Sequence, residues 1–260
     1  MSTLNRAKIQ PFLSVVMPVF NERATIAEII SRVSSVGIDK ELIIVDDCST
    51  DGTREFLMDL RKSFSRKGSA LPIKFAFHER NRGKGAALRT GFAQVTGSIV
   101  VIQDADLELD PQEYRQLVEP IQTGYADVVY GSRFLGKERG EVPAAHFWGN
   151  RLLTAASNLC TGLNLTDVWT CYKTFRREVL DGMRLQEDRF AFEPEFTAKV
   201  AARGWRVAEI PIGYMCRSEE DGKKISWKDG FRGLACTVYY SVSARLSFSG
   251  QVRPAVAVRN

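Results

Sequence analysis

Short apolar runs alternate with amphipathic segments over the first half of this 260-residue chain. Runs that are rich in β-branched residues and end in polar positions predict strands, and they cover residues 13–17, 41–47, 73–78, 98–103 and 126–130. Apolar residues at helical spacing predict helices between them, two opening at Asn21 and Asp51 and two covering 85–95 and 111–121. These strand–helix repeats predict an α/β fold with a mainly parallel sheet and helices on both faces.

Three residues in these segments carry local predictions. Pro18 follows the first apolar run and is expected to end that strand, because proline has no backbone N–H to donate. The side chain of Asn21 is expected to cap the helix that follows. Pro111 lies at the first turn of the helix over 111–121, a position that proline favours.

The polar residues that follow the strands are expected to meet, because ligands of parallel sheets bind beyond the carboxyl ends of the strands. Four of these ends carry polar or charged groups: Phe20-Asn21-Glu22, Asp46-Asp47, Asp104-Ala105-Asp106 and Gly131-Ser132-Arg133. Polar residues at the ends of four strands, all at one edge of the sheet, are less easily explained by chance than one motif alone. The sequence therefore predicts a ligand site at this edge.

An acidic run follows the fourth predicted strand. Buried carboxylates are costly unless a cation neutralises them, and oxygen-only ligands favour Mg²⁺ or Mn²⁺. Asp104, Asp106 and Glu108 are therefore candidate ligands of a divalent metal. A solvated turn in which Asp110-Pro111 caps the next helix is the alternative interpretation of the same residues.

Composition and charge restrict the class of protein only loosely. The chain is 44% hydrophobic and 26% charged, as expected for a globular protein with a sizeable core. A net charge of +5 fits an anionic partner such as a nucleotide, a phospholipid surface or a nucleic acid, but the basic residues are scattered among acids. Five cysteines without Cys-x-x-Cys spacing predict free thiols in a reducing compartment.

Neither a membrane span nor secretion is expected from the hydropathy pattern. No segment approaches the roughly 20 apolar residues that a span requires. Residues 1–11 contain no apolar signal core. Residues 249–260 are expected to form a tail.

Two common nucleotide sites do not fit the sequence. The loop after the first strand contains Pro18 and no glycine, so it cannot form the amide cradle of a dinucleotide site. Gly83-Lys84-Gly85 lacks the Lys-Ser or Lys-Thr pair of a P-loop, and it follows the third strand instead of the first.

Five motifs, taken in order, resemble a known family. They are MPVFNE at 17–22, VDDCSTDGT at 45–53, NRGKGAAL at 81–88, QDADLE at 103–108 and GSRF at 131–134. The family is the GT-A fold inverting glycosyltransferases, in particular the branch of dolichol-phosphate mannose and glucose synthases. The resemblance covers about residues 13–246. It implies a Rossmann-like GT-A domain over 1–248, with a nucleotide-sugar half at about 11–110, an acceptor half at about 111–225 and an amphipathic helix at about 226–246.

The resemblance also implies roles for individual residues on the donor side. Those that match the nucleotide-sugar site are Pro18, Phe20, Glu22, Val45, Asp47, Lys84, Asp104 and Ala105. Asp104, Asp106 and Glu108 match the metal-binding run, where mannose synthases often have glutamine at the last position. Bound Mg²⁺ or Mn²⁺ would neutralise charge developing on the departing nucleoside diphosphate.

The acceptor implied by the resemblance is a phosphate. A phosphate monoester has a second pKa of about 6, so near neutrality it attacks as a dianion and needs cations more than a general base. Arg133, Arg217 and Lys223 match phosphate-contacting residues, and Arg151 is a further candidate.

The segment Asp167–Lys173 resembles a family segment beside the acceptor, with Cys171 in place of the usual glycine. Asp167 is either a base for a hydroxyl acceptor or an orienting group for a phosphate. The candidate catalytic residues are Asp104, Asp106, Asp167 and Arg133. Glu193 and Glu195, which flank Pro194, are expected near the site, in a functional or a capping role.

The C-terminal segment has apolar residues at helical spacing with basic residues between them. The apolar positions are Trp227, Phe231, Leu234, Val238, Val242 and Leu246. This pattern fits a helix lying on a membrane with its basic residues at anionic headgroups, or a helix packed on the protein's own core.

The leading hypothesis is a metal-dependent enzyme that moves a hexose from a nucleotide sugar, of GDP-mannose or UDP-glucose type, to polyprenyl or dolichyl phosphate. It is expected to be peripheral on the cytoplasmic face of the membrane and to have no nucleic-acid partner. One alternative is a soluble glycosyltransferase that uses a hydroxyl acceptor. Another is a sugar nucleotidyltransferase, which normally opens with a glycine-rich loop. A non-catalytic membrane-associated binding module is a third, and the intact acidic run argues against it.

Overall fold

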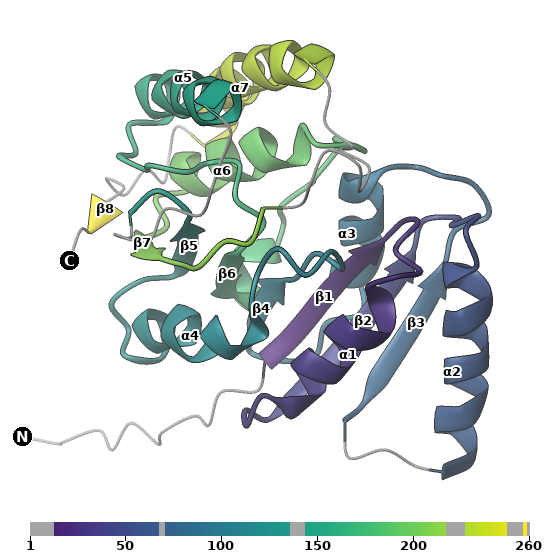
Figure 1. Ribbon diagram of the computed structural model, residues 1–260. Helices are drawn as coiled ribbons and strands as arrows, with labels where there is room; N and C mark the ends of the chain where they lie inside the picture. Colours follow the sequence, from purple (N-terminus) through teal and green to yellow (C-terminus); the bar gives the residue numbers. More distant parts are fainter. Residues whose placement is uncertain (1–12, 68–70, 136–143, 217–226, 249–256, 259–260) are drawn as a thin grey trace, which may run out of the picture.

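The computed structural model describes residues 13–67, 71–135, 144–216, 227–248 and 257–258. Within them, one sheet of eight strands has the order β3-β2-β1-β4-β6-β5-β7-β8 (Figure 1). The strands are β1 (Leu13–Val19), β2 (Lys40–Asp46), β3 (Ile73–Phe77), β4 (Ile99–Ile102), β5 (Val128–Ser132), β6 (Lys173–Arg176), β7 (Val207–Pro211) and β8 (Ala257–Val258). Only β6 runs antiparallel to its neighbours, which confirms the predicted mainly parallel sheet.

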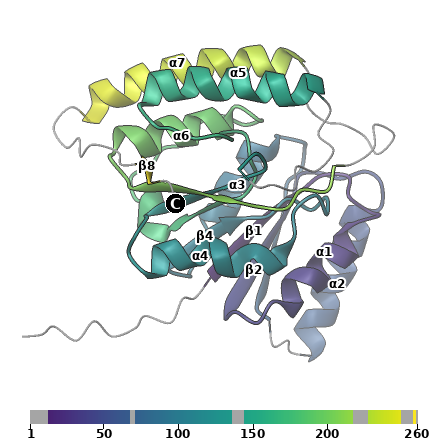
Figure 2. The same cartoon turned by 60° about the vertical axis from the view of Figure 1, so that its left-hand side comes forward.

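Helices cover both faces of this sheet. They are α1 (Ile26–Ser35), α2 (Thr53–Lys67), α3 (Lys84–Phe92), α4 (Tyr114–Gln122), α5 (Ala144–Thr161), α6 (Phe192–Ala202) and α7 (Trp227–Phe248). Figures 1 and 2 show α1 and α4 on one face and α3 and α6 on the other, with α5 and α7 side by side beyond α6. The predicted α/β architecture with helices on both faces is therefore confirmed.

The prediction that Pro18 ends the first strand is wrong. Pro18 lies inside β1 and is paired with Val45 of β2. On the other side, the pairing of β1 with β4 extends only from Leu13 to Val16. Pro18 therefore occupies a part of the strand that has a neighbour on one side alone, where proline is tolerated.

The predicted cap at Asn21 is also wrong. The helix α1 begins at Ile26, and Thr25 occupies the N-cap position. Asn21 has a φ of 53°, and its side-chain oxygen accepts the N–H of Thr50. The residue thus ties two loops together, because asparagine tolerates a left-handed backbone better than most residues.

Pro111 begins a 3₁₀ turn (Pro111–Glu113) and not the α-helix itself, which starts at Tyr114. Asp110 caps this turn, since its carboxylate accepts the N–H of Gln112 at 3.0 Å. The cap considered in the alternative interpretation of the acidic run is therefore present. It does not involve Asp104 or Asp106, so their role as metal ligands stays a prediction.

Several elements of the second half have no clear sequence pattern. The α6 helix is buried at all positions except Lys199, which is half-buried, so it lacks the polar face that marks a surface helix. β6 is short and begins with the buried Lys173. At the other end, β8 lies in the segment predicted to be a tail and pairs with β7.

Candidate active site

Four strand ends meet at one edge of the sheet, as predicted. β1 runs parallel to both β2 and β4, and β5 has the same direction because β6 is antiparallel to both β4 and β5. The segment 20–22, Asp47, Asp104 and Arg133 follow these four strands directly. The topology therefore places donor and acceptor candidates on the same side of the molecule.

The loop after β1 is fastened to the loop after β2. The N–H of Asn21 donates to Ser49 Oγ at 2.9 Å, and the N–H of Glu22 donates to Thr53 Oγ1 at 3.0 Å. Glu22 is buried, and its carboxylate accepts a hydrogen bond from the hydroxyl of Thr25 at 3.0 Å. These bonds fix the backbone on which the predicted nucleotide contacts Phe20 and Glu22 depend.

The other predicted nucleotide contacts differ in their exposure. Pro18 and Phe20 are half-buried at the edge of the sheet. Val45 is fully buried in the core, and Ala105 is 3% exposed. Val45 could therefore support a nucleotide site only by packing beneath the residues that line it.

Asp47 organises the loop before α3. Its carboxylate accepts the N–H groups of Arg82 at 2.9 Å and Gly83 at 2.6 Å, and it bonds the Nδ1 atom of His78 at 2.7 Å. A hollow of about 470 Å³ lies next to this loop and is lined by Phe77, His78, Glu79, Arg80 and Arg82. Asp47 thus sets the position of the loop that carries Lys84.

Lys84 connects the acidic run to α6. Its ammonium lies 2.9 Å from Asp104 Oδ2 and 3.3 Å from Glu193 Oε1. Glu193 also pairs with the buried Lys173. Burial opposes the charge on Lys84, but Asp104, Cys171 and Glu193 outweigh it and raise the pKa of Lys84 well above its usual value. Lys84 is therefore a permanent cation beside Asp104.

The loop that carries Lys84 packs tightly against the segment before α6. A Cβ on Gly85 would lie 2.1 Å from the carbonyl oxygen of Glu187. Glu195 holds that segment in turn, since its carboxylate accepts the N–H groups of Gln186 and Glu187. Glu193 and Glu195 thus both lie next to the Lys84 loop, as predicted for their position.

A buried amide anchors the start of the acidic run. The hydroxyls of Tyr114 and Tyr172 donate to Gln103 Oε1 at 2.7 and 2.8 Å, and Gln103 Nε2 donates to the carbonyl of Asp104 at 3.0 Å. These bonds hold the backbone at Asp104, so that its carboxylate emerges at a fixed place beyond β4.

The acidic run turns sharply after Asp106. Leu107 has a φ of 63°, and Asp106 Oδ1 accepts the N–H of Glu108 at 3.2 Å. Among the described residues, no three histidine, cysteine, aspartate or glutamate side chains converge as a ready metal cage. Mg²⁺ commonly uses one or two carboxylates together with substrate phosphates, so the oxygen donors of Asp104 and Asp106 fit a metal that arrives with a diphosphate.

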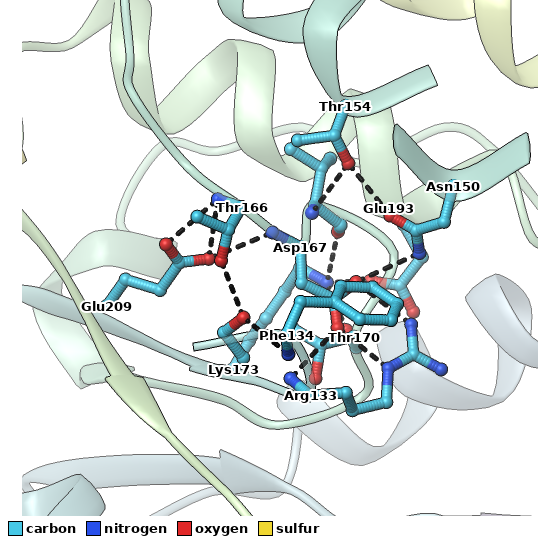
Figure 3. A network of polar contacts seen from close by, with 12 residues as sticks. Arg133, Phe134, Asn150, Thr154, Thr166, Asp167, Thr170, Lys173, Glu193 and Glu209 are labelled. Atoms are coloured by element: carbon cyan, nitrogen blue, oxygen red, sulfur yellow. Dashed lines mark hydrogen bonds and ion pairs between the residues drawn. The ribbon is translucent and has the colours of Figure 1, made fainter. Parts of the chain in front are cut away.

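Arg133 and Asp167 form a buried, bidentate ion pair (Figure 3). Arg133 Nε and Nη2 donate to the two carboxylate oxygens of Asp167 at 2.7 and 2.9 Å, and Asn150 Nδ2 donates to Oδ1 at 3.0 Å. Burial alone would raise the pKa of Asp167, but Arg133 and Asn150 hold it below its ordinary value. Asp167 is thus a weak base, and the geometry favours the orienting role over proton abstraction.

The guanidinium of Arg133 is placed between two rings. Its Cζ atom lies 5.5 Å from the ring centroid of Phe134 and 5.2 Å from that of Tyr214. The pKa of Arg133 is raised, because charge interactions with Asp167, Tyr214 and Glu108 outweigh the opposing effect of burial. The interaction with Glu108 shows that the acidic run and the Arg133–Asp167 pair are neighbours.

The remaining acceptor candidates are not brought into this pair. Arg151 is exposed on α5, one residue after Asn150, which does contact Asp167. Arg217 and Lys223 lie outside the described residues, so their predicted phosphate contacts stay predictions. Cys171 is buried and has an ordinary backbone, since the positive φ values of non-glycine residues in the described chain are at Asn21, Cys48 and Leu107.

Several residues of the site had no sequence signal strong enough to single them out. They are Gln103, Asn150, Thr166, Lys173 and Glu209. Each is a buried or half-buried polar residue with at least one partner from another part of the chain. The alternation of polar and apolar positions cannot identify such partners. Gln103 and Lys173 do lie inside segments that resemble the family, QDADLE at 103–108 and Asp167–Lys173, but no role was assigned to either residue.

The mainly parallel sheet with helices on both faces, and with its polar strand ends at one edge, is an α/β fold of the GT-A type. Residues 14–184 match the model of the family described as "Glycosyl transferase family 2". This match covers more than half of the chain, and the chain belongs to that family. The predicted resemblance is thereby confirmed.

Curated relatives and solved structures agree with this assignment. The chain is 32% identical over 217 residues to the undecaprenyl-phosphate 4-deoxy-4-formamido-L-arabinose transferase of Pseudomonas aeruginosa, covering 81% of this chain and 60% of the relative. The protein of the same name from Aeromonas hydrophila is 30% identical, with 81% and 62% covered. The chain thus spans about three fifths of the length of these relatives.

Similar solved structures share the fold. Glucosyl-3-phosphoglycerate synthase from Mycobacterium tuberculosis, in complex with uridine diphosphate, superposes with a TM-score of 0.65 at 22% identity, covering 92% of this chain and 81% of that one. TarS from S. aureus gives a TM-score of 0.58 at 20% identity, with 91% and 70% covered. The synthase has also been crystallised with Mn²⁺ and UDP.

Proposed function

We propose that this chain is a glycosyltransferase that moves a sugar from a nucleotide sugar to a polyprenyl phosphate. The observation that carries the proposal is the Arg133–Asp167 pair, which lies beside the acidic run and offers a cation but no free base. Within the described residues, Arg133 Nη1 is not used by Asp167, since the ion pair occupies Nε and Nη2. Arginine binds phosphate through such remaining donors.

The relatives support this choice of acceptor and indicate the donor. The curated proteins named above transfer a sugar to undecaprenyl phosphate by their names, and the structural neighbour binds UDP. We therefore propose a UDP-sugar in preference to a GDP-sugar.

In this proposal, one group of residues binds the nucleotide sugar and another binds the acceptor phosphate. The loops at Glu22 and Asp47 would hold the base and ribose, while Lys84 would neutralise phosphate charge beside Asp104. Asp104 and Asp106 would hold Mg²⁺ or Mn²⁺, which when bound supplies charge neutralisation for the leaving nucleoside diphosphate. Arg133, oriented by Asp167, would place the phosphate dianion on the side of the sugar opposite the leaving group.

We further propose that α5 and α7 attach the enzyme to a membrane surface. Large apolar side chains are exposed on both helices: Trp148, Leu152 and Leu159 on α5, and Leu234, Val238, Tyr239 and Val242 on α7. The opposite side of α7, with Cys236 and Tyr240, packs on α6. Within the described part of the chain, no helix has the length and hydropathy of a membrane span. Attachment of these helices at the lipid surface accounts for their apolar faces.

The function is tested with the purified protein, undecaprenyl phosphate and a panel of UDP- and GDP-sugars, with and without Mn²⁺. We expect transfer of labelled sugar into the lipid fraction from a UDP-sugar, and loss of transfer with a chelator. Arg133→Lys should lower the efficiency for the acceptor by roughly tenfold or more, because bidentate geometry is lost. The control Arg32→Lys changes a surface ion pair on α1 and should have no effect. Efficient transfer to soluble hydroxyl acceptors, with none to the lipid, would refute the proposal.

Membrane attachment is tested separately by flotation with anionic liposomes. A double variant with Leu152→Asp and Val238→Asp should remain at the bottom of the gradient. Met58→Asp, on the distant helix α2, changes an exposed apolar residue in the same way and should float like the unchanged protein. Equal flotation of both variants would exclude this surface.

A further inference from the structure

The segment that presents Asp167 is held by a carboxylate from β7. Glu209 Oε1 accepts the N–H groups of Thr166 and Asp167, each at 2.9 Å, and Oε2 also lies 2.9 Å from the N–H of Thr166 (Figure 3). The hydroxyl of Thr166 meets Ser132 Oγ at 2.6 Å, next to Arg133. One side chain thus fixes the two peptide groups on either side of Thr166.

We infer that Glu209 is a positioning residue for acceptor use, and that its ionised form holds Asp167 in the register that aligns Arg133. This inference rests on the proposed function, because it concerns the residue pair assigned to the acceptor phosphate. Hydrogen bonds to a charged carboxylate are roughly twice as strong as those to a neutral one. Loss of the charge on Glu209 is therefore expected to loosen the segment without removing its acceptor oxygens.

The surroundings of Glu209 bring its protonation into the range of physiological pH. Burial raises the pKa of Glu209 and the charge of Asp167 adds to this effect, while the amides of Thr166 and Asp167 and the side chain of Thr166 lower it; the resulting pKa is about 7. Tyr130 of β5 is the residue paired with Glu209 in the sheet. The hydroxyl of Tyr130 forms a hydrogen bond with the hydroxyl of Thr197. On the other side of β7, the described residues of β8 pair with Val207 and Ala208 and not with Glu209.

The nearby cations Arg133 and Lys173 are paired with other carboxylates and not with Glu209. Arg133 is engaged with the carboxylate of Asp167, and Lys173 is paired with Glu193. The ammonium of Lys173 lies 5.1 Å from the ring centroid of Tyr130. Among the described residues, no cation is paired with Glu209 itself, so its negative charge is stabilised by the two amides and by the side chain of Thr166.

The role is tested by comparing Glu209→Gln with the unchanged protein across pH 5.5–8.5. Glutamine keeps an acceptor oxygen but never ionises, so it imitates the protonated form. The ratio of the two kcat/KM values for the acceptor is expected to be near 1 at pH 5.5 and to rise to about tenfold at pH 8.5. The titration of the acceptor phosphate itself cancels in this ratio. A ratio that stays constant with pH would show a merely structural role and overturn the inference.

Two controls keep the test independent of other failures. Glu119→Gln changes an exposed carboxylate on α4 and should give a ratio near 1 at every pH. In the unchanged protein labelled with ¹⁵N, the amide resonances of Thr166 and Asp167 should shift together with a midpoint near pH 7. This measurement needs neither substrate nor variant. An absence of the shift overturns the inference, while a shift without any transfer to polyprenyl phosphate refutes the proposed function alone.

Discussion

Lys84 and Asp104 form an ion pair of 2.9 Å that joins the loop before α3 to the acidic run after β4. Glu193 of α6 contacts the same ammonium at 3.3 Å, so one lysine pairs with carboxylates from two distant segments of the chain. A metal-bound diphosphate that binds at Asp104 would therefore meet a cation already in place. Preformed charge of this kind avoids reorganisation during the reaction.

Replacement of Lys84 by glutamine is expected to lower both stability and donor affinity. Two largely buried carboxylates lose their shared cation, and breaking a buried pair typically costs about 3–5 kcal/mol. Lys84→Arg keeps the charge and should retain more of the stability. Urea denaturation and calorimetric titration with UDP measure the two effects. Unchanged UDP affinity in Lys84→Gln would contradict a role at the phosphates.

Asp106→Ala is expected to abolish metal-dependent transfer while the fold remains intact. Removing a charge from an acidic cluster relieves repulsion in the metal-free protein and offsets the loss of the hydrogen bond from the N–H of Glu108, so little change in stability is expected. Asp59→Ala, at an exposed position on α2, is the matched control. Retention of most activity in saturating Mn²⁺ would remove Asp106 from the metal site.

Glu22→Ala and Asp47→Ala should weaken donor binding more than they slow the chemical step, because base and ribose contacts act in both the ground and the transition state. Asp47→Ala should also cost about 1–3 kcal/mol of stability, since the amides of Arg82 and Gly83 lose their acceptor. Glu28→Ala, at an exposed position on α1, is the control. Calorimetry with free UDP decides the point, and equal affinity in both variants would argue against the donor assignment.

Gly85→Ala is expected to displace the Lys84 loop and to weaken UDP binding by roughly tenfold or more. The new methyl group would overlap the carbonyl of Glu187, which is backbone and cannot rotate away. Gly149→Ala is the matched control, because nothing lies within 4 Å of the added carbon on α5. Equal UDP affinities for the two variants would show that the packing at Gly85 does not set the loop.

The unusual pKa of Glu209 predicts a characteristic pH dependence of stability. Its pKa rises from 4.5 in the unfolded chain to about 7 in the folded protein, so folding favours the protonated form. The resulting stability is fully present below about pH 4.5 and is lost as the pH rises through 7. As the pH rises from about 4.5 to above 7, the free energy of unfolding of the unchanged protein should fall by up to about 3 kcal/mol relative to that of Glu209→Gln. Urea denaturation at several pH values measures the difference, and a pH-independent difference would contradict the raised pKa.

The order of strands and helices in the first half could be predicted from the sequence alone. Apolar runs that end at Asp47 and Asp104 mark strands whose direction is fixed by the helices between them, so their acidic ends had to meet. The motifs at 17–22, 45–53 and 103–108 also identified the family. Local patterns suffice here because each depends on residues that are close along the chain.

The tertiary structure alone decided how the charges are paired. The sequence allowed Asp167 to be a base or an orienting group, and its bidentate contact with Arg133, 34 residues away, favours the orienting role. Glu209 reaches the same segment from more than 40 residues further along the chain. The predictions for Pro18 and Asn21 were wrong because both roles depend on distant contacts. Pro18 fits inside β1 because the pairing with β4 ends at Val16. Asn21 binds the N–H of Thr50 in another loop and does not cap the helix. A sequence pattern records which side chains are buried, whereas the partner of a buried charge depends on contacts between distant segments.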